Sequence, residues 1–156
     1  MNGNKANINW YPGHMAKAER EIESRIKIVD MVIELVDARA PFSSRNTSFD
    51  RILKNKPRFV LMTKSDLADS QITEKWQSFY KEKGFLSLAV NLKNFKEEKK
   101  IINMCLAMLS EKREKEAQKG LKTRAIRAMI IGVPNVGKST LINALAKRKA
   151  AIAGNK

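Results

Sequence analysis

The feature that most constrains this chain is the run Gly132–Thr140, which reads Gly-Val-Pro-Asn-Val-Gly-Lys-Ser-Thr and fits G-x-x-x-x-G-K-[ST]. The apolar residues 128–131 before it predict a buried parallel strand, and residues 139–146 after it predict a helix with one apolar face. Glycines allow backbone N–H groups to converge on an anion, and the helix adds the positive end of its dipole. The sequence therefore predicts a strand–loop–helix unit that binds nucleotide phosphates. The alternative is a glycine-rich strand–helix turn with an incidental lysine.

Within this loop, Lys138 is expected to reach the β- and γ-phosphates, and the Ser139 hydroxyl is expected to hold Mg²⁺. The residues expected to contact phosphate are Asn135, Val136, Gly137, Lys138, Ser139 and Thr140. The loop does not select a base, because many ATPases carry the same pattern. A P-loop ATPase or kinase therefore stays open as an interpretation of this motif alone.

A second motif, Thr63-Lys64-Ser65-Asp66, directly follows the apolar run 56–62, which predicts another strand. An aspartate at a strand end can accept hydrogen bonds from both N1–H and the exocyclic amine of guanine. Adenine lacks this pair of donors, so an unpaired carboxylate would cost about 1–3 kcal/mol against it. The aliphatic part of Lys64 can cover the base. The motif therefore favours guanine, and the alternative is an exposed turn with a capping Asp66.

The remaining pattern predicts an α/β fold with a doubly wound parallel sheet of about four strands. The expected strands cover residues 28–36, 56–62, 85–90 and 128–131, and the expected helices cover residues 14–28, 46–55, 70–83 and 95–119. The turn at Asn91 and Leu92 follows the third strand, where a backbone N–H could meet the guanine O6 carbonyl. An ordinary strand–helix turn fits these two residues equally well.

The charge of the chain makes a polyanionic partner a serious hypothesis. The 156 residues include 31 Lys and Arg against 16 Asp and Glu, a net charge of +15. The densest basic region follows Leu109, although it could also be a solvated helix end. The single cysteine, Cys105, excludes an internal disulfide and a zinc cluster and is expected in the core. No run suits a membrane span or signal peptide, so we expect a cytoplasmic protein.

The order of the two motifs is unusual, because ordinary GTPases place the phosphate loop before the guanine motif. Here residues 63–66 precede Gly132–Thr140. Together with Trp10–Lys17 and Asp37–Pro41, this order resembles the circularly permuted ribosome biogenesis GTPase A family, which assists late assembly of the bacterial large ribosomal subunit. The resemblance implies that GTP or GDP and the large subunit with its rRNA are partners. It also implies an N-terminal segment and helix over 1–27 and a partial G domain over 28–156.

The resemblance also implies roles for single residues. Thr63–Asp66 corresponds to the family's Asn-Lys-x-Asp, and Thr63 replaces the asparagine whose amide would bridge the base and the phosphate loop. Asn91 and Leu92 match the family's base-contacting loop only loosely. Asn135 matches an asparagine linked to K⁺-assisted hydrolysis, alongside Mg²⁺ as the general cofactor. His14 matches the histidine thought to position the attacking water, although its pattern alone is more typical of a turn or cap.

Parts of a working GTPase are not found in this sequence. None of the five aspartates has a glycine three residues later, and no candidate switch threonine follows the phosphate loop. We therefore expect a truncated or partial chain that does not hydrolyse GTP alone. By analogy the strand order is fourth-first-second-third, which would leave the outer edge of the 128–131 strand unpaired. The alternative to a GTP-hydrolysing assembly factor is a nucleotide-responsive RNA-binding module without relevant hydrolysis of its own.

Overall fold

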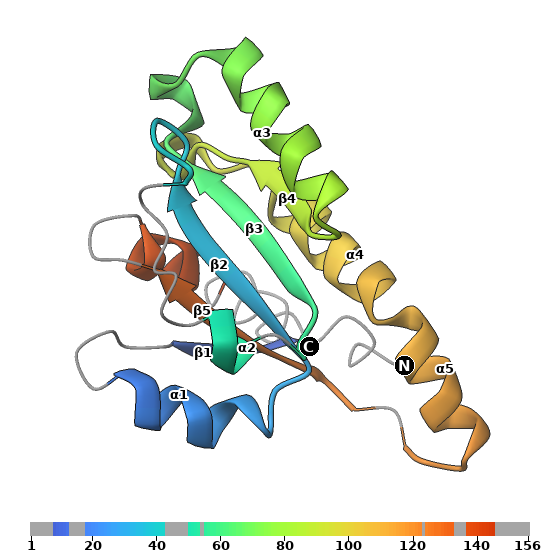
Figure 1. Ribbon diagram of the computed structural model, residues 1–156. Helices are drawn as coiled ribbons and strands as arrows, with labels where there is room; N and C mark the ends of the chain where they lie inside the picture. Colours follow the sequence, from blue (N-terminus) through green and yellow to red (C-terminus); the bar gives the residue numbers. More distant parts are fainter. Residues whose placement is uncertain are drawn as a thin grey trace.

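The computed structural model describes residues 8–12, 18–42, 50–53, 55–122, 124–132 and 137–145. Its centre is a parallel five-stranded sheet with the order β1-β5-β2-β3-β4 (Figure 1). The strands are β1 (Ile8–Pro12), β2 (Met31–Asp37), β3 (Arg58–Thr63), β4 (Leu86–Ala89) and β5 (Ile126–Gly132). The helices are α1 (Ala18–Ile26), α2 (Asp50–Leu53), α3 (Ser70–Glu82), α4 (Glu98–Met108), α5 (Ser110–Gln118), helix 138–145 and the 3₁₀ turns η4 (Ser65–Leu67) and η5 (Leu92–Asn94).

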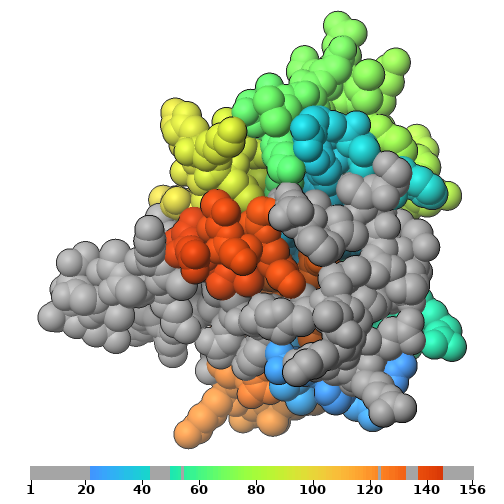
Figure 2. Space-filling view, turned by 90° about the vertical axis from the view of Figure 1, so that its left-hand side faces the viewer, coloured from blue at the N-terminus to red at the C-terminus, as the bar shows by residue number. Residues whose placement is uncertain are grey.

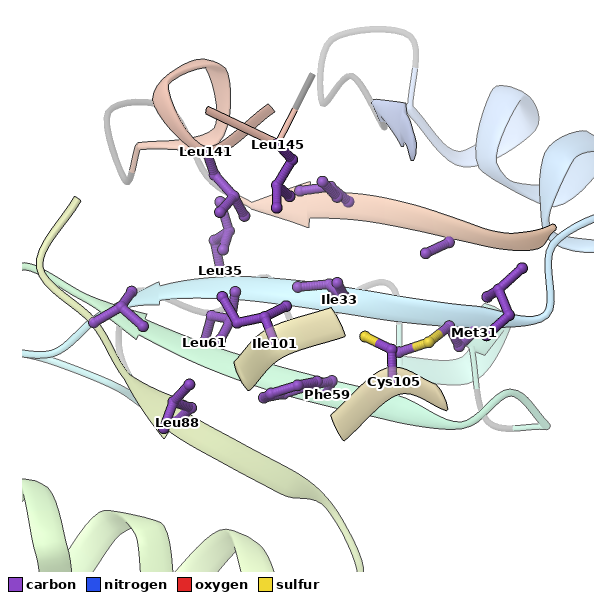
Figure 3. Packing of buried hydrophobic residues seen from close by; sticks show 14 of the residues in the cluster. Met31, Ile33, Leu35, Phe59, Leu61, Leu88, Ile101, Cys105, Leu141 and Leu145 are labelled. Carbon is purple, nitrogen blue, oxygen red and sulfur yellow. The ribbon is translucent and has the colours of Figure 1, made fainter. Parts of the chain in front are cut away.

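Alternation along β2 divides the core between the two faces of the sheet. Met31, Ile33 and Leu35 share one buried cluster with residues of α4 and helix 138–145. Figure 3 shows Ile101 and Cys105 of α4, and Leu141 and Leu145 of helix 138–145, over this face. On the opposite face, Val32 packs with residues of α1 and α2, and Val36 packs with Tyr80 of α3. Helices therefore cover both faces, as the doubly wound interpretation predicted.

Cys105 lies in this core, as the sequence predicted. Burial raises the pKa of its thiol to about 12. Among the described residues, no helix is both long and apolar enough to cross a membrane.

The four predicted strands occur in the predicted order, but the prediction of an unpaired β5 edge is wrong. β1 pairs with β5 in parallel, from Ile8 opposite Ile126 to Pro12 opposite Ile130. Ile8–Pro12 forms a strand through this pairing, because the edge of β5 presents N–H and C=O groups that another strand can satisfy. Pro12 is tolerated because it ends an edge strand.

The helix expected over 95–119 is two helices, α4 and α5, which meet at Leu109. Leu109 is buried and is the last residue of the apolar stripe. Residues 110–118 contain no apolar stripe to hold them on the sheet, so α5 departs from it as a separate charged helix (Figure 1). The helices predicted over 14–28 and 46–55 are described over Ala18–Ile26 and Asp50–Leu53, and residues 14–17, 46–49 and 54 lie outside the described part of the chain.

Candidate nucleotide site

The predicted nucleotide motifs meet at one edge of the sheet. Because the strands are parallel, their carboxyl ends lie at the same edge, where ligands of doubly wound folds bind. Figure 2 shows segments from this edge on one face of the molecule: cyan after β2, green after β3, yellow after β4 and red-orange in helix 138–145. Residues about 70 positions apart in the sequence are thereby brought together.

Thr63 bonds the end of β3 to the end of β2. It is fully buried, its hydroxyl donates a 3.2 Å hydrogen bond to the Val36 carbonyl, and its own carbonyl accepts a 2.7 Å bond from the Ala38 N–H. A threonine therefore satisfies a buried position at this strand end, where its methyl group packs and its hydroxyl is bonded to backbone. In this structure the Thr63 hydroxyl is engaged with β2.

Lys64 turns the chain sharply after β3. Its φ of 61° lies in the left-handed region, which is uncommon for a residue with a side chain and marks strain that recurs at functional sites. The turn lets the Ser65 N–H donate a 3.1 Å bond to the Val90 carbonyl, which fixes the motif to the end of β4. Asp66 follows within η4 and is exposed. The turn thus presents Asp66 to solvent while its backbone is held by two strands.

Asp37, at the end of β2, holds Lys64 from the side. The two form an ion pair at 3.5 Å between Lys64 Nζ and Asp37 Oδ2. Asp37 also accepts hydrogen bonds from the backbone N–H, Nε and Nη2 of Arg39 at 2.9, 3.0 and 2.7 Å. The side-chain hydrogen bond from Arg39 is the main reason that the pKa of Asp37 is lowered to about 2.

Arg39 also interacts electrostatically with Asp66 of the predicted guanine motif. Its pKa is raised, first by its hydrogen bond to Asp37 and, more weakly, by the charge of Asp66. The link between Asp37 and Lys64 was not predicted from the sequence. The available signal was a carboxylate at a strand end, followed two residues later by an arginine.

Asn91 and Leu92 follow β4, and Leu92 lies against Gly137 of the phosphate loop. The Asn91 side chain accepts a 3.0 Å bond from the Lys93 N–H and so starts η5. Leu92 is half-buried and packs against the main core cluster. A Cβ added to Gly137 would lie 2.6 Å from Leu92 Cδ1, so the two loops are in direct contact.

Gly137 begins the helix expected to bind phosphate. Its φ of 102° is one that L side chains rarely adopt, and its carbonyl accepts a 2.9 Å bond from the Leu141 N–H. Lys138 is half-buried, and this burial lowers its pKa. Ser139 and Thr140 are exposed in the first helical turn. Leu141 and Leu145 anchor the helix on the sheet, which leaves its N-terminal turn open to a ligand (Figure 3).

The structure thus places at the carboxyl edge of the sheet Thr63, Lys64, Ser65, Asp66, Asn91, Leu92, Gly137, Lys138, Ser139 and Thr140. His14, Asn135 and Val136 lie outside the described residues, and their roles remain predictions. The parallel sheet, the loop before helix 138–145 and a base motif earlier in the chain define a P-loop GTPase fold in circularly permuted order.

Comparison with known proteins identifies the family. Residues 127–156 match a family described as 50S ribosome-binding GTPase. Ribosome biogenesis GTPase A of Bacillus cereus is 48% identical over 149 residues, covering 96% of this chain and 50% of that protein. Its namesake in Thermotoga maritima is 35% identical, with 94% of this chain and 49% of that protein covered. The chain belongs to the ribosome biogenesis GTPase A family and spans about half the length of these relatives.

The fold comparison agrees with this assignment. The GNP-bound structure of YlqF from T. maritima is 34% identical and has a TM-score of 0.56, covering 81% of this chain and 46% of that one. A GDP-bound YlqF structure gives 34% identity and a TM-score of 0.55, covering 81% of this chain and 47% of that one. The permuted strand order is therefore shared with solved GTPase structures.

Proposed function

We propose that this chain is the guanine-nucleotide-binding part of a GTP-hydrolysing assembly factor for the large ribosomal subunit. The observation that carries the proposal is the placement of Lys64 and Asp66 at the same sheet edge as Gly137–Thr140. Base-selecting and phosphate-binding groups must lie at the two ends of one nucleotide, and here a direct contact between Leu92 and Gly137 joins their supporting loops.

Guanine selection falls to Asp66 and Lys64. The Asp66 carboxylate accepts from N1–H and the exocyclic amine, and the stem of Lys64 covers the ring. Asp37 holds the Lys64 ammonium at 3.5 Å, and its low pKa keeps it ionised at neutral pH. The base is therefore read by a turn whose lysine is already positioned before the nucleotide arrives.

The phosphates fall to residues 135–140, with Lys138 as the cation and the helix N-terminus as the dipole. The exposed hydroxyl of Ser139 suits Mg²⁺, which takes few protein ligands and completes its shell with phosphate and water oxygens. Mg²⁺ would supply positive charge against the β- and γ-phosphates. We assign Asn135 to a K⁺ on the basis of the sequence resemblance alone.

His14 is the proposed water-positioning residue. β1 supports this role, because its last residue, Pro12, pairs with Ile130 and so ends at the same sheet edge as the strand before the phosphate loop. His14 follows Pro12 by two residues. Hydrolysis at the wild-type rate by full-length His14→Ala protein on ribosomal subunits would contradict the assignment.

We further propose that the protein works in the cytoplasm and that hydrolysis switches its affinity for the nascent large subunit and its rRNA. The competing function is a nucleotide-responsive RNA-binding module whose own hydrolysis is irrelevant. Single-turnover GTP hydrolysis by the full-length protein, with and without ribosomal subunits, separates them. Stimulation by subunits supports the first function, and equal, negligible rates support the second.

The direct test of the proposal is titration of this chain with GDP and, separately, with ADP in Mg²⁺. We expect ADP to bind at least tenfold more weakly, a difference of about 1.4 kcal/mol. Asp66→Ala should remove this preference, whereas Lys75→Ala on the exposed side of α3 should keep it. Equal affinity of the unsubstituted chain for the two nucleotides, or a preference for ADP, would refute the guanine assignment.

A further inference from the structure

A small hollow of about 30 Å³ lies at the opposite edge of the sheet from the nucleotide motifs. It is formed by α5, the residue before β2 and the segment that leads into β5. Leu109 and Ile126 are buried at its base. Its charged lining residues are Asp30, Lys112, Arg113, Glu116, Lys122 and Arg124, and we call this surface the α5 hollow. Because it adjoins the amino ends of β2 and β5, it is separated from the nucleotide site by the length of the strands.

The α5 hollow lies in the most basic part of the chain. Residues 110–127 contain seven lysines and arginines and three glutamates. Within this segment α5 does not contribute to the core, because it has no buried residue and projects from the end of α4 (Figure 1). Its composition is therefore not explained by packing against the sheet.

A buried carboxylate orients the cations of the hollow. Asp30 accepts bonds of 2.8 and 2.7 Å from the Arg124 guanidinium, 3.1 Å from Lys112 Nζ and 2.9 Å from the Arg127 N–H. The side chain of Asp30 is 7% exposed, whereas those of Lys112 and Arg124 are 50% and 42% exposed. The charge of Asp30 is thus inside the protein, whereas its partners Lys112 and Arg124 reach solvent.

Neutral backbone carbonyls hold further cations nearby. Arg113 Nη2 donates to the Arg124 carbonyl at 3.3 Å, and Lys56 Nζ donates to the Val29 carbonyl at 2.8 Å. Arg127 Nη1 donates to the Ile28 carbonyl at 3.5 Å. These bonds fix side chains without cancelling their charge. The result is an ordered group of cations whose charge is only partly balanced by the buried Asp30 and the partly exposed Glu116.

We propose that the α5 hollow binds the phosphate backbone of RNA. The proposal rests on the proposed function for its class of partner, and it adds the surface that makes the contact. Guanidinium groups match phosphate oxygens through paired hydrogen bonds, and cations held in advance lose less entropy on binding. None of the described residues that line the hollow is aromatic, so backbone contact is favoured over base stacking.

The hollow suits RNA better than a membrane surface. Insertion into a lipid interface requires a broad apolar face beside the cations. Among the described lining residues, Leu121 is the only large apolar side chain that is exposed. The cations also line a concave surface, which fits a rounded nucleic-acid backbone better than a flat bilayer.

The test compares two charge-reversed forms of this chain for binding to a fluorescent RNA hairpin of about 20 base pairs. Arg113→Glu/Lys122→Glu removes two cations of the hollow and leaves the bonds of Asp30 in place. Lys75→Glu/Lys81→Glu changes the net charge equally on exposed positions of α3 and is the matched control. Circular dichroism and GDP titration of each protein verify that fold and nucleotide site are intact.

We expect the hollow variant to bind RNA about tenfold more weakly than the unsubstituted chain. In a plot of log K against log[KCl] between 50 and 200 mM, the magnitude of its slope should fall by about 2. The control should remain within about twofold of the unsubstituted chain. Equal losses of RNA affinity in both variants would show that RNA responds to the net charge of the chain and not to this surface, which would overturn the proposal. Unchanged RNA affinity of the hollow variant would also overturn it. Binding to phosphatidylserine vesicles without RNA binding would also overturn it. If the unsubstituted chain does not prefer GDP to ADP, the proposed function is refuted, but the comparison of RNA binding between the two variants stays valid.

Discussion

Replacing Asp30 with asparagine should destabilise the fold without touching the nucleotide site. Asp30 joins three segments that are distant in sequence, through Lys112 of α5, Arg124 before β5 and the Arg127 N–H within β5. Burial acts to raise the pKa of Asp30, but the hydrogen bonds from Arg124, Arg127 and Lys112 outweigh it and hold the pKa well below its usual range. Asparagine has the same shape but cannot balance the cations.

The expected cost follows from these contacts. Breaking a fully buried ion pair costs about 3–5 kcal/mol, but Lys112 and Arg124 are half exposed and can turn to water. The asparagine oxygen can still accept from the Arg127 N–H. We therefore expect a loss of about 2 kcal/mol, which corresponds to a fall in Tm of about 4–8 °C for a chain of this size.

The assay is urea unfolding of the unsubstituted chain, Asp30→Asn and the control Glu74→Gln, which changes an exposed carboxylate on α3. Glu74→Gln should lie within about 0.5 kcal/mol of the unsubstituted chain. Because the folded pKa of Asp30 is lowered, its contribution is present above its unfolded pKa of about 4 and is lost as pH falls toward the folded pKa. The difference between the unsubstituted chain and Asp30→Asn should therefore be constant from pH 5 to 7 and shrink below about pH 4. An equal difference at pH 3, or no difference at pH 7, would refute this reasoning.

Three further results are expected. Gly137→Ala should weaken GDP binding and lower the free energy of unfolding by about 1–3 kcal/mol. Adding Leu92→Ala should not restore GDP binding, because a shorter side chain at residue 92 relieves the contact but not the positive φ. Full rescue by the second substitution would contradict the role of backbone strain. Iodoacetamide should modify Cys105 in urea but not in the native chain, since the buried thiol has a pKa of about 12; equal rates would place it outside the core. Asp37→Asn should weaken GDP binding about two- to tenfold and leave ADP binding unchanged, because Lys64 loses its ion pair; equal weakening of both nucleotides in paired titrations would argue against base positioning.

The sequence predicted those parts of the fold that depend on local pattern. The apolar runs before residues 63 and 132 are buried strands because each places side chains into both faces of the sheet. β1 could not be predicted in this way, because Ile8–Pro12 is short, mixed and ends in proline, and it becomes a strand only by pairing with β5. The break at Leu109 could be predicted only in part: the apolar stripe ends there, but the pattern does not show that the helix divides into α4 and α5.

The same division applies to the site. The places of Asp66 and Lys138 at the carboxyl edge of the sheet were predictable because their motifs combine residue type, spacing and position after a strand. The ion pair between Asp37 and Lys64 was not, because it depends on the alignment of β2 with β3, which pairs Asp37 with Thr63. The buried hydroxyl bond of Thr63 depends on the same register. Spacing along the chain carries no information about such contacts between strands.

The central claim is that Asp66 reads guanine, and exchange of its hydrogen-bonding pattern tests it most directly. Xanthine carries a carbonyl oxygen where guanine carries the exocyclic amine, so an asparagine can donate to the group that aspartate repels. Titration of Asp66→Asn with GDP and with xanthosine diphosphate should show preference for the xanthine nucleotide, while the unsubstituted chain prefers GDP. If Asp66→Asn remains folded and still prefers GDP, Asp66 does not read the base and the guanine site must lie elsewhere.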